Sequence, residues 1–184
     1  RIQLREKIKK ELFDSLKKSF LETVTQGRTA LTHSCSITDQ EFQNIVVEYV
    51  QSYWAEQNWQ SLDSQQAAAV GAGNNNLLLT ARAGSGKTRT LLSRAAFLHK
   101  HCDIPANELM LLAFNRSAAI EMSVRAKEYF SEEQPTIMHF DALATALVQP
   151  EETIIRGDDL KMFVQRVMRD FLDDRVWGPR IRDL

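Results

Sequence analysis

Eight consecutive residues near the middle of the chain constrain its fold more than any other feature. Residues 81–88 read Ala-Arg-Ala-Gly-Ser-Gly-Lys-Thr, and they lie between a short apolar run and a helical pattern. Gly84 and Gly86 allow a tight turn that brings backbone N–H groups close to an anion, where a Cβ would intrude. A helix that begins near Lys87 adds the positive end of its dipole. The segment therefore predicts a phosphate-binding loop between a strand and a helix.

This segment is a Walker A loop with Ala81 where the strict pattern has glycine. Lys87 is expected to reach the β- and γ-phosphates, and the Thr88 hydroxyl is expected to coordinate Mg²⁺. A glycine-rich turn that merely precedes Lys and Thr is the alternative, and the strand and helix flanks argue against it. The residues predicted to bind the phosphates are Ala83, Gly84, Ser85, Gly86, Lys87 and Thr88, with Lys87 and Thr88 as the candidate catalytic pair.

Short apolar runs alternate with helical patterns after Trp59. Strands joined by helical crossovers form a parallel sheet with helices on its faces, so an α/β fold is predicted. The expected strands are Leu77–Thr80, Leu109–Phe114 and Thr136–His139, and the expected helices cover 87–101, 116–130 and 141–148.

Residues 1–58 have a different, purely helical character. Residues 2–24 place apolar side chains at the spacing of an amphipathic helix, whose basic opposite face is more simply a solvated surface than a contact for DNA or a protein partner. Thr38 and Glu41 form a capping box that announces a second helix. Its apolar stripe from Phe42 to Trp54 is expected in the core or against the next domain, with a cofactor or partner groove as the minority interpretation.

Composition limits the remaining possibilities. The net charge is −1, so nucleic-acid binding would have to come from a local patch. Apolar runs are too short to span a bilayer and no signal peptide opens the chain, which predicts a cytoplasmic protein without membrane contact. The chain begins with Arg1 and not Met, which suggests a piece of a longer protein. His99-Lys100-His101-Cys102 is expected to place cations at the negative end of a helix, with a metal site as the weaker alternative.

The segment Leu62–Val70, upstream of the loop, resembles the Q motif of UvrD/Rep-like superfamily 1 DNA helicases. The resemblance implies that Gln66, and not its neighbour Gln65, recognises adenine through its amide. It continues through Gly84–Leu91, where Arg89 matches an arginine that lies against the adenine face in the family. A surface glutamine and a solvated arginine are the alternatives for the two positions.

Two further segments carry the same resemblance. Ala113–Met122 is similar to family motif Ia, although Ala113 replaces a usual Thr, and Ile137–Leu143 is similar to a Thr-Phe-His segment of which His139 alone is retained. The core is the alternative place for Phe114, and a structural role is the alternative for His139. The residues implied to contact single-stranded DNA are Phe114, Asn115, Arg116 and His139.

The resemblance implies a P-loop, RecA-like parallel sheet flanked by helices, preceded by an N-terminal helical region. The expected domains are a helical extension over 1–58, a partial ATP-binding subdomain over 59–150, and a helical segment over 151–184 that starts an inserted subdomain. ATP and Mg²⁺ are the implied cofactors and single-stranded DNA is the implied partner, with a further protein partner for the N-terminal helices.

The implied activity is that of an ATP-dependent DNA helicase that translocates on single-stranded DNA. No apolar strand ends in the Asp-Glu pair that such enzymes need for hydrolysis, and Asp158-Asp159 and Asp173-Asp174 are better interpreted as helix caps and surface charge. These 184 residues are therefore expected to bind nucleotide without turning it over. The alternatives are a P-loop switch or regulatory module without unwinding activity, and an interaction scaffold built on residues 1–58.

Overall fold

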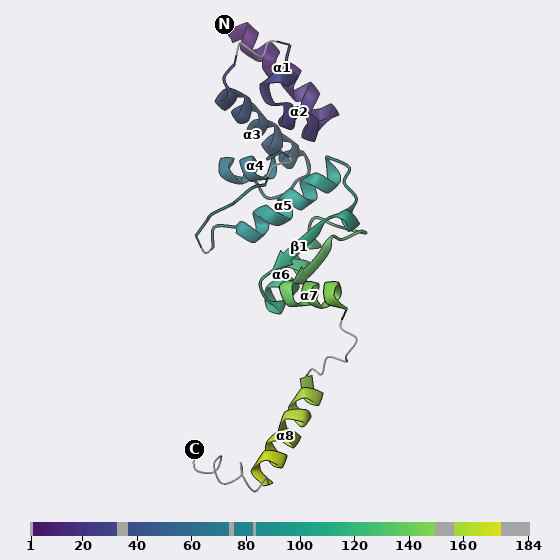
Figure 1. The fold of residues 1–184 in the computed structure, drawn as a ribbon. Helices are drawn as coiled ribbons and strands as arrows, with labels where there is room; N and C mark the ends of the chain where they lie inside the picture. The colour runs from purple at the N-terminus through teal and green to yellow at the C-terminus, as the bar shows by residue number, and fades with distance from the viewer. Residues whose placement is uncertain (1, 33–36, 74–75, 83, 150–156, 174–184) are drawn as a thin grey trace. The chain divides into compact units, whose positions relative to one another are not determined.

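The structure is a computed structural model that describes residues 2–32, 37–73, 76–82, 84–149 and 157–173. It divides into two compact units, Arg1–Phe140 and Asp141–Leu184. In chain order the elements are α1 (Ile2–Lys18), α2 (Phe20–Gln26), η1 (Gly27–Ala30), α3 (Asp39–Glu56), α4 (Ser64–Val70), α5 (Lys87–Lys100), η3 (Ala106–Glu108), β1 (Met110–Ala113), α6 (Arg116–Ala126), β2 (Thr136–His139), α7 (Phe140–Val148) and α8 (Gly157–Asp173) (Figure 1). None of the helices in these ranges combines the length and apolar character needed to cross a membrane.

The amphipathic helix predicted over residues 2–24 is present as two helices, α1 and α2, that meet at Ser19. Ser19 has a non-helical backbone conformation, so α1 ends before it and α2 begins after it, and its hydroxyl donates to Glu22 at 3.1 Å. The predicted apolar face is nevertheless confirmed, because Ile8, Leu12, Leu16 and Phe20 are all buried.

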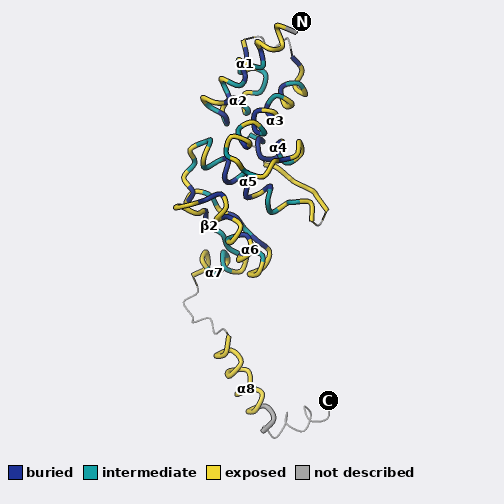
Figure 2. The backbone as a smooth tube through the Cα atoms, turned by 180° about the vertical axis from the view of Figure 1, so that it is seen from behind, coloured by how far each residue is buried: buried dark blue, intermediate teal, exposed yellow. Residues whose placement is uncertain are grey.

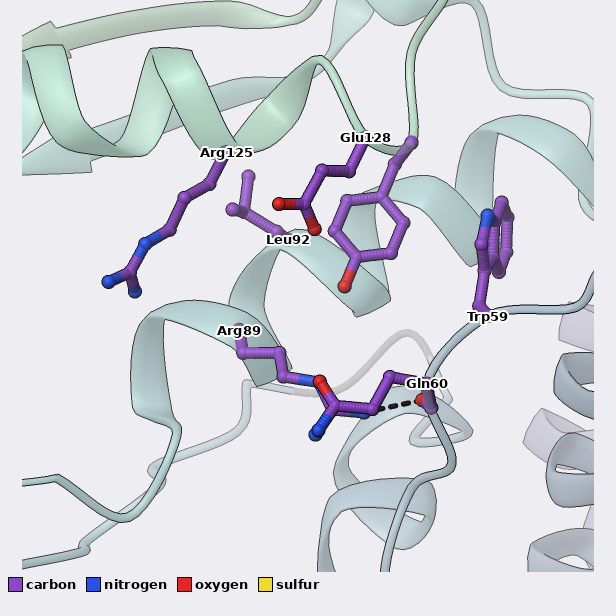
Figure 3. Close-up of a pocket in the computed structure, with 7 residues that line it drawn as sticks. Trp59, Gln60, Arg89, Leu92, Arg125 and Glu128 are labelled. Carbon is purple, nitrogen blue, oxygen red and sulfur yellow. Dashed lines mark hydrogen bonds between the residues drawn. The ribbon is translucent and has the colours of Figure 1, made fainter.

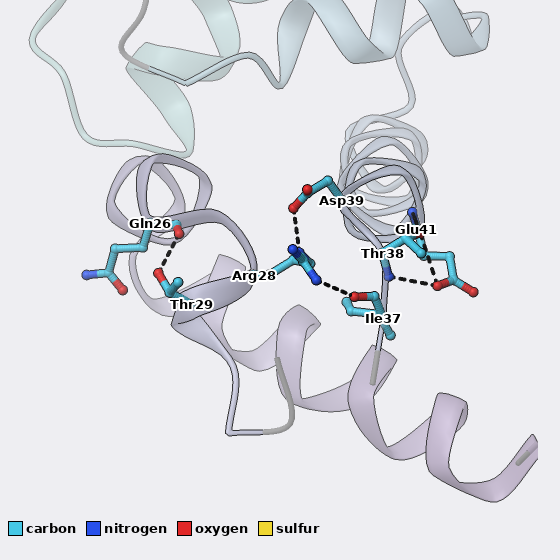
Figure 4. A network of polar contacts seen from close by, with 7 residues as sticks. All are labelled: Gln26, Arg28, Thr29, Ile37, Thr38, Asp39 and Glu41. Carbon is cyan, nitrogen blue, oxygen red and sulfur yellow. Dashed lines mark hydrogen bonds and ion pairs between the residues drawn. The ribbon is translucent and has the colours of Figure 1, made fainter. Parts of the chain in front are cut away.

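The start of α3 confirms the predicted capping box. The backbone N–H of Glu41 donates to Thr38 Oγ1 at 3.1 Å, and the backbone N–H of Thr38 donates to Glu41 Oε2 at 2.9 Å. Arg28 donates to Asp39 and to the carbonyl of Ile37, which ties η1 to the same helix end (Figure 4). The predicted stripe of α3 is core, since Phe42, Val46, Tyr49, Val50 and Trp54 are buried.

The N-terminal helices share one hydrophobic core with the helices that follow them. Buried residues from Ile8 to Phe130 form a single cluster, in which α3 packs against α4 and α4 packs against α5. A Cβ added at Gly71, just after α4, would meet Val50 Cγ2 at 2.8 Å, so α3 and the end of α4 are in close contact. The two parts of the chain on either side of Trp59 are therefore packed together in the first unit.

In the segment His99–Cys102, His99 and Lys100 lie in the last turn of α5 as predicted, whereas His101 departs from the predicted role of a cation. His101 Nε2 lies 3.2 Å from the Tyr49 hydroxyl, and the rings of Phe20, Tyr53 and Phe97 surround it at centroid distances between 4.6 and 5.6 Å. Burial lowers the pKa of His101, which favours the neutral ring. Among the described residues no three His, Cys, Asp or Glu side chains gather as metal ligands, so the metal alternative has no support.

Two strands form a parallel sheet. β1 pairs with β2 in a register that places Met110 beside Thr136 and Ala113 beside His139, and α6 connects them. These two predicted strands and the crossover helix between them are confirmed. The parallel α/β pattern is thus present as a small sheet in a chain dominated by helices.

The third predicted strand, Leu77–Thr80, is wrong for this structure. These residues adopt no regular structure and form part of the exposed segment between α4 and α5 (Figure 2). Leu78 is 87% exposed. A strand inside a sheet needs hydrogen-bonding neighbours on its flanks, and in the described ranges β1 and β2 pair only with each other. Apolar composition alone therefore did not place this segment in the sheet.

The second unit confirms a helical tail. α8 carries the predicted apolar stripe, and its members with described side chains, Leu160, Phe163, Val164, Val167 and Met168, are exposed apart from the half-buried Val167. The helix thus presents an apolar stripe that no described residue of its own unit covers.

Candidate nucleotide-binding site

The glycine-rich segment leads directly into α5. Gly84 has φ +78° and Gly86 has φ +85°, a backbone region that residues with a Cβ rarely adopt. Gly86 is the N-cap of α5 and offers no side-chain cap to the first turn, so the N–H groups there have no such acceptor. The two predicted glycine positions are therefore those that the turn requires, while the predicted phosphate contact Ala83 lies outside the described residues.

The polar side chains of the loop bond to the loop itself. Lys87 Nζ donates to the carbonyls of Ala81 at 2.9 Å and Arg82 at 2.7 Å, and Ser85 Oγ donates to Arg82 O at 2.8 Å. The ammonium thus lies over the loop that precedes it, the side on which an anion held by the loop would sit. Thr88 follows in the first turn of α5 and is half-buried.

The structure brings Gln66 to the same loop. Asp63 caps α4 by accepting from Gln66 N at 2.8 Å, and Gln66 Oε1 accepts from Asp63 N at 3.2 Å. A Cβ added at Gly86 would meet Gln66 Nε2 at 3.1 Å, so the glutamine amide lies against the N-cap of α5. Gln65 is exposed and does not line this place. Of the two glutamines, Gln66 is thus the one that lies beside the loop, and its role in binding adenine stays a prediction.

Arg89 is anchored and not solvated. Its Nη2 donates to the carbonyl of Gln60 and, at 2.6 Å, to that of Ser61. Its Nε is buried and has no acceptor among the described residues. The side chain borders a pocket of about 280 Å³ whose other lining residues are Trp59, Gln60, Leu92, Arg125, Glu128 and Tyr129 (Figure 3).

The residues proposed for nucleic acid gather at one edge of the sheet. β1 and β2 are parallel and Ala113 pairs with His139, so Phe114 and His139 lie at the carboxyl ends of neighbouring strands. Phe114 is 86% exposed, which rules out the core alternative. Asn115 Oδ1 caps α6 by accepting from Ala118 N at 2.8 Å, and Arg116 is exposed.

Two side chains near the loop were not expected from the sequence. Arg94 of α5 donates to four carbonyls at and after the end of α4, and Trp54 of α3 donates its indole N–H to Gln60 O at 3.0 Å. Their acceptors are backbone carbonyls, which carry no residue-type signal in a sequence. Only the place of Trp54 on the apolar stripe hinted that it faces inward.

Known proteins that resemble this chain are described as helicases. The profile of a family described as UvrD/REP helicase N-terminal domain matches residues 62–170. DNA helicase IV of Escherichia coli (strain K12) is 42% identical over 88 residues, which is 48% of this chain and 13% of that protein. DNA helicase II of the same strain is 32% identical over 132 residues, or 65% of this chain and 18% of that protein. ATP-dependent DNA helicase PcrA of Staphylococcus epidermidis is 29% identical over 133 residues, or 66% of this chain and 18% of that protein. The chain thus spans under a fifth of the length of each.

Proposed function

The chain belongs to the UvrD/REP helicase N-terminal domain family, and we propose that it supplies the ATP-binding part of an ATP-dependent DNA helicase that translocates on single-stranded DNA. The observation that carries the proposal is the place of Gln66 against Gly86, because it joins a group able to recognise a base to a loop able to hold phosphates. We expect the two-stranded sheet to be part of a RecA-like P-loop sheet.

The residues of the site fit a nucleoside triphosphate. The uncapped first turn of α5 and the left-handed Gly84 and Gly86 provide N–H groups for phosphate oxygens, and the Lys87 ammonium supplies a positive charge beside them. The Arg89 side chain borders a pocket of about 280 Å³, where its planar guanidinium could lie against the base. Bound ATP would supply a transferable phosphoryl group and Mg²⁺ would neutralise its charge.

Thr88 is the one loop residue proposed as a direct ligand of Mg²⁺. Magnesium in such sites is held by few protein oxygens together with phosphates and water, so a single hydroxyl next to the phosphate loop suits a metal that enters with the nucleotide. The carboxylates that would complete hydrolysis are not found as an Asp-Glu pair in these 184 residues.

Titration of the chain with ATP and magnesium, followed by a phosphate-release assay, tests this division of roles. We expect weak, magnesium-dependent binding without release of phosphate, because the loop holds the triphosphate but no acidic pair positions the water. Release of phosphate that depends on magnesium and disappears with Thr88→Val would contradict the second half of the proposal.

We propose that Phe114, Asn115, Arg116 and His139 contact single-stranded DNA at the carboxyl edge of the sheet. Phe114 offers an exposed ring for base stacking, and Arg116 offers a charge for the phosphate backbone. The basic face of α1 is proposed to contact a protein partner, and a helicase with this role is proposed to act in the cytoplasm.

Removal of the Phe114 ring gives the test of this surface. Phe114→Ala should weaken binding of a labelled oligo-dT by about tenfold in fluorescence anisotropy, since stacking of one base contributes about 1–3 kcal/mol. Its unfolding midpoint should not change because the ring is exposed. Phe163→Ala, which removes a half-exposed ring from α8, is the control for loss of a phenylalanine, and equal effects of the two substitutions would count against the proposed surface.

A further inference from the structure

The link between α3 and α4 is held from both sides at three consecutive carbonyls. Trp54 Nε1 donates to Gln60 O at 3.0 Å, and Gln51 Nε2 donates to Leu62 O at 3.0 Å. Arg89 Nη2 donates to the carbonyls of Gln60 and Ser61 from the opposite direction. Gln60 O therefore accepts from Trp54 of α3 and from Arg89 of α5 at once, and Figure 3 shows the bond from Arg89.

The two donors on α3 are well placed to keep this link rigid. Trp54 is 1% exposed, and its ring lies 4.4 Å from the ring of Trp59 between centroids, so its indole has little freedom to leave Gln60. Gln51 precedes it by one helical turn on the same face of α3. Their acceptors begin one residue after Trp59 and end one residue before Asp63, the cap of α4.

What the link holds is the base-recognition side of the proposed site and not its phosphate side. Arg89 receives its orientation from Gln60 and Ser61, and the capping box of Asp63 fixes Gln66 beside Gly86. Lys87, by contrast, bonds to the carbonyls of Ala81 and Arg82, which are not part of the link. A change in the link should therefore affect binding of the base more than binding of the phosphates.

Resting on the proposed function, we propose that α3 is a positioning element for recognition of the purine base, in which Trp54 and Gln51 hold the Gln60–Leu62 backbone and thereby orient Arg89 and Gln66. These two side chains act through others and do not touch the nucleotide. They lie outside residues 62–170, the range that matches the helicase family, so this chain adds to its nucleotide site from its own N-terminal helices.

Comparison of two ligands separates this role from a general effect on folding. The chain of residues 1–184 is titrated with ATP and with inorganic tripolyphosphate, both with magnesium, as wild type, Trp54→Phe and Gln51→Met. Trp54→Phe keeps an aromatic ring but removes the indole donor, and Gln51→Met keeps the side-chain length but removes the amide. We expect each substitution to lower the affinity for ATP by about threefold to tenfold, the effect of one lost hydrogen bond. The affinity for tripolyphosphate should not change.

Gln43→Met is the matched control, because Gln43 lies exposed on the same helix and should change neither affinity. The positioning role is overturned if a variant loses affinity for ATP and for tripolyphosphate by the same factor. It is also overturned if both variants bind ATP and tripolyphosphate as tightly as the wild type does. In both cases the proposed function stands. The wild-type chain is also titrated with GTP. If it binds tripolyphosphate but binds ATP no more tightly than GTP, the positioning role is likewise overturned. Failure of the wild type to bind either ligand overturns the proposed function and this inference together. Because Gln51 is only half-buried, we expect Gln51→Met to leave the chain folded. This variant therefore gives a result even where Trp54→Phe lowers stability.

Discussion

Replacement of Lys87 by alanine is expected to lower the affinity of the chain for ATP with magnesium by at least about 100-fold. An ammonium paired with phosphate oxygens makes charge-assisted hydrogen bonds that are roughly twice as strong as neutral ones, and a charge about 4 Å away adds several kcal/mol at the effective dielectric of a protein surface. Isothermal titration or the fluorescence of a labelled ATP gives the measurement.

The same substitution should leave folding almost unchanged. Lys87 is exposed, and the carbonyls of Ala81 and Arg82 that accept from it are exposed too, so water can replace the lost bonds. We expect the free energy of unfolding to change by less than about 0.5 kcal/mol. Lys18→Ala, at an exposed lysine of α1, serves as the control for loss of one positive charge. An ATP affinity within a few-fold of wild type would show that residues 81–88 do not hold the phosphates.

Local chemistry explains which parts of the fold were predictable. Thr38 with Glu41 is a pair of side chains that satisfies free N–H groups at a helix start wherever it occurs, and the structure has both of its hydrogen bonds. The strand Thr136–His139 was predicted with its observed bounds, and β1 provides the hydrogen-bonding neighbour that a strand needs. Gly84 and Gly86 were predictable because only a residue without a Cβ adopts their backbone angles readily.

The predictions were wrong where residues elsewhere in the chain determine the local structure. Leu77–Thr80 has the composition of a strand, but no strand among the described residues pairs with it, and strand formation requires such a neighbour. Periodicity also missed the break between α1 and α2, because the apolar spacing continues through Ser19 while the backbone does not. The role of His101 was misjudged since four aromatic side chains from three helices, far apart in sequence, create its apolar surroundings.

In the candidate site, too, some residues could be predicted from the sequence and others could not. Gln66, Lys87 and Arg89 could be proposed from the sequence because their residue types and spacing indicate chemistry that acts on a ligand. The link that orients Arg89 was not found, because its acceptors at Gln60, Ser61 and Leu62 are backbone carbonyls, and every residue of every sequence has one.

Substitution of Arg94 by methionine is expected to destabilise the first unit by about 2–4 kcal/mol, the largest effect on folding that we predict. The guanidinium donates to the carbonyls of Ala69, Val70, Ala72 and Gly73 at 2.8 to 3.2 Å. Carbonyls at the end of a helix have no partner within the helix and carry the negative end of its dipole. Methionine retains the length of the stem but leaves these part-buried acceptors without a donor.

The geometry of the side chain distinguishes this interaction from an ordinary surface charge. Arg94→Lys keeps the charge but cannot reach four acceptors with a planar fork, so it should recover less than half of the lost stability. Arg5→Met removes a largely exposed arginine whose ion pair with Glu41 should contribute no more than about 1 kcal/mol. Urea unfolding followed by circular dichroism at low and high salt measures all three variants. Added salt should diminish the effect of Arg5→Met and leave that of Arg94→Met, because part-buried hydrogen bonds are screened little. Equal destabilisation by Arg94→Met and Arg5→Met would mean that the contacts of Arg94 with the end of α4 do not stabilise the fold.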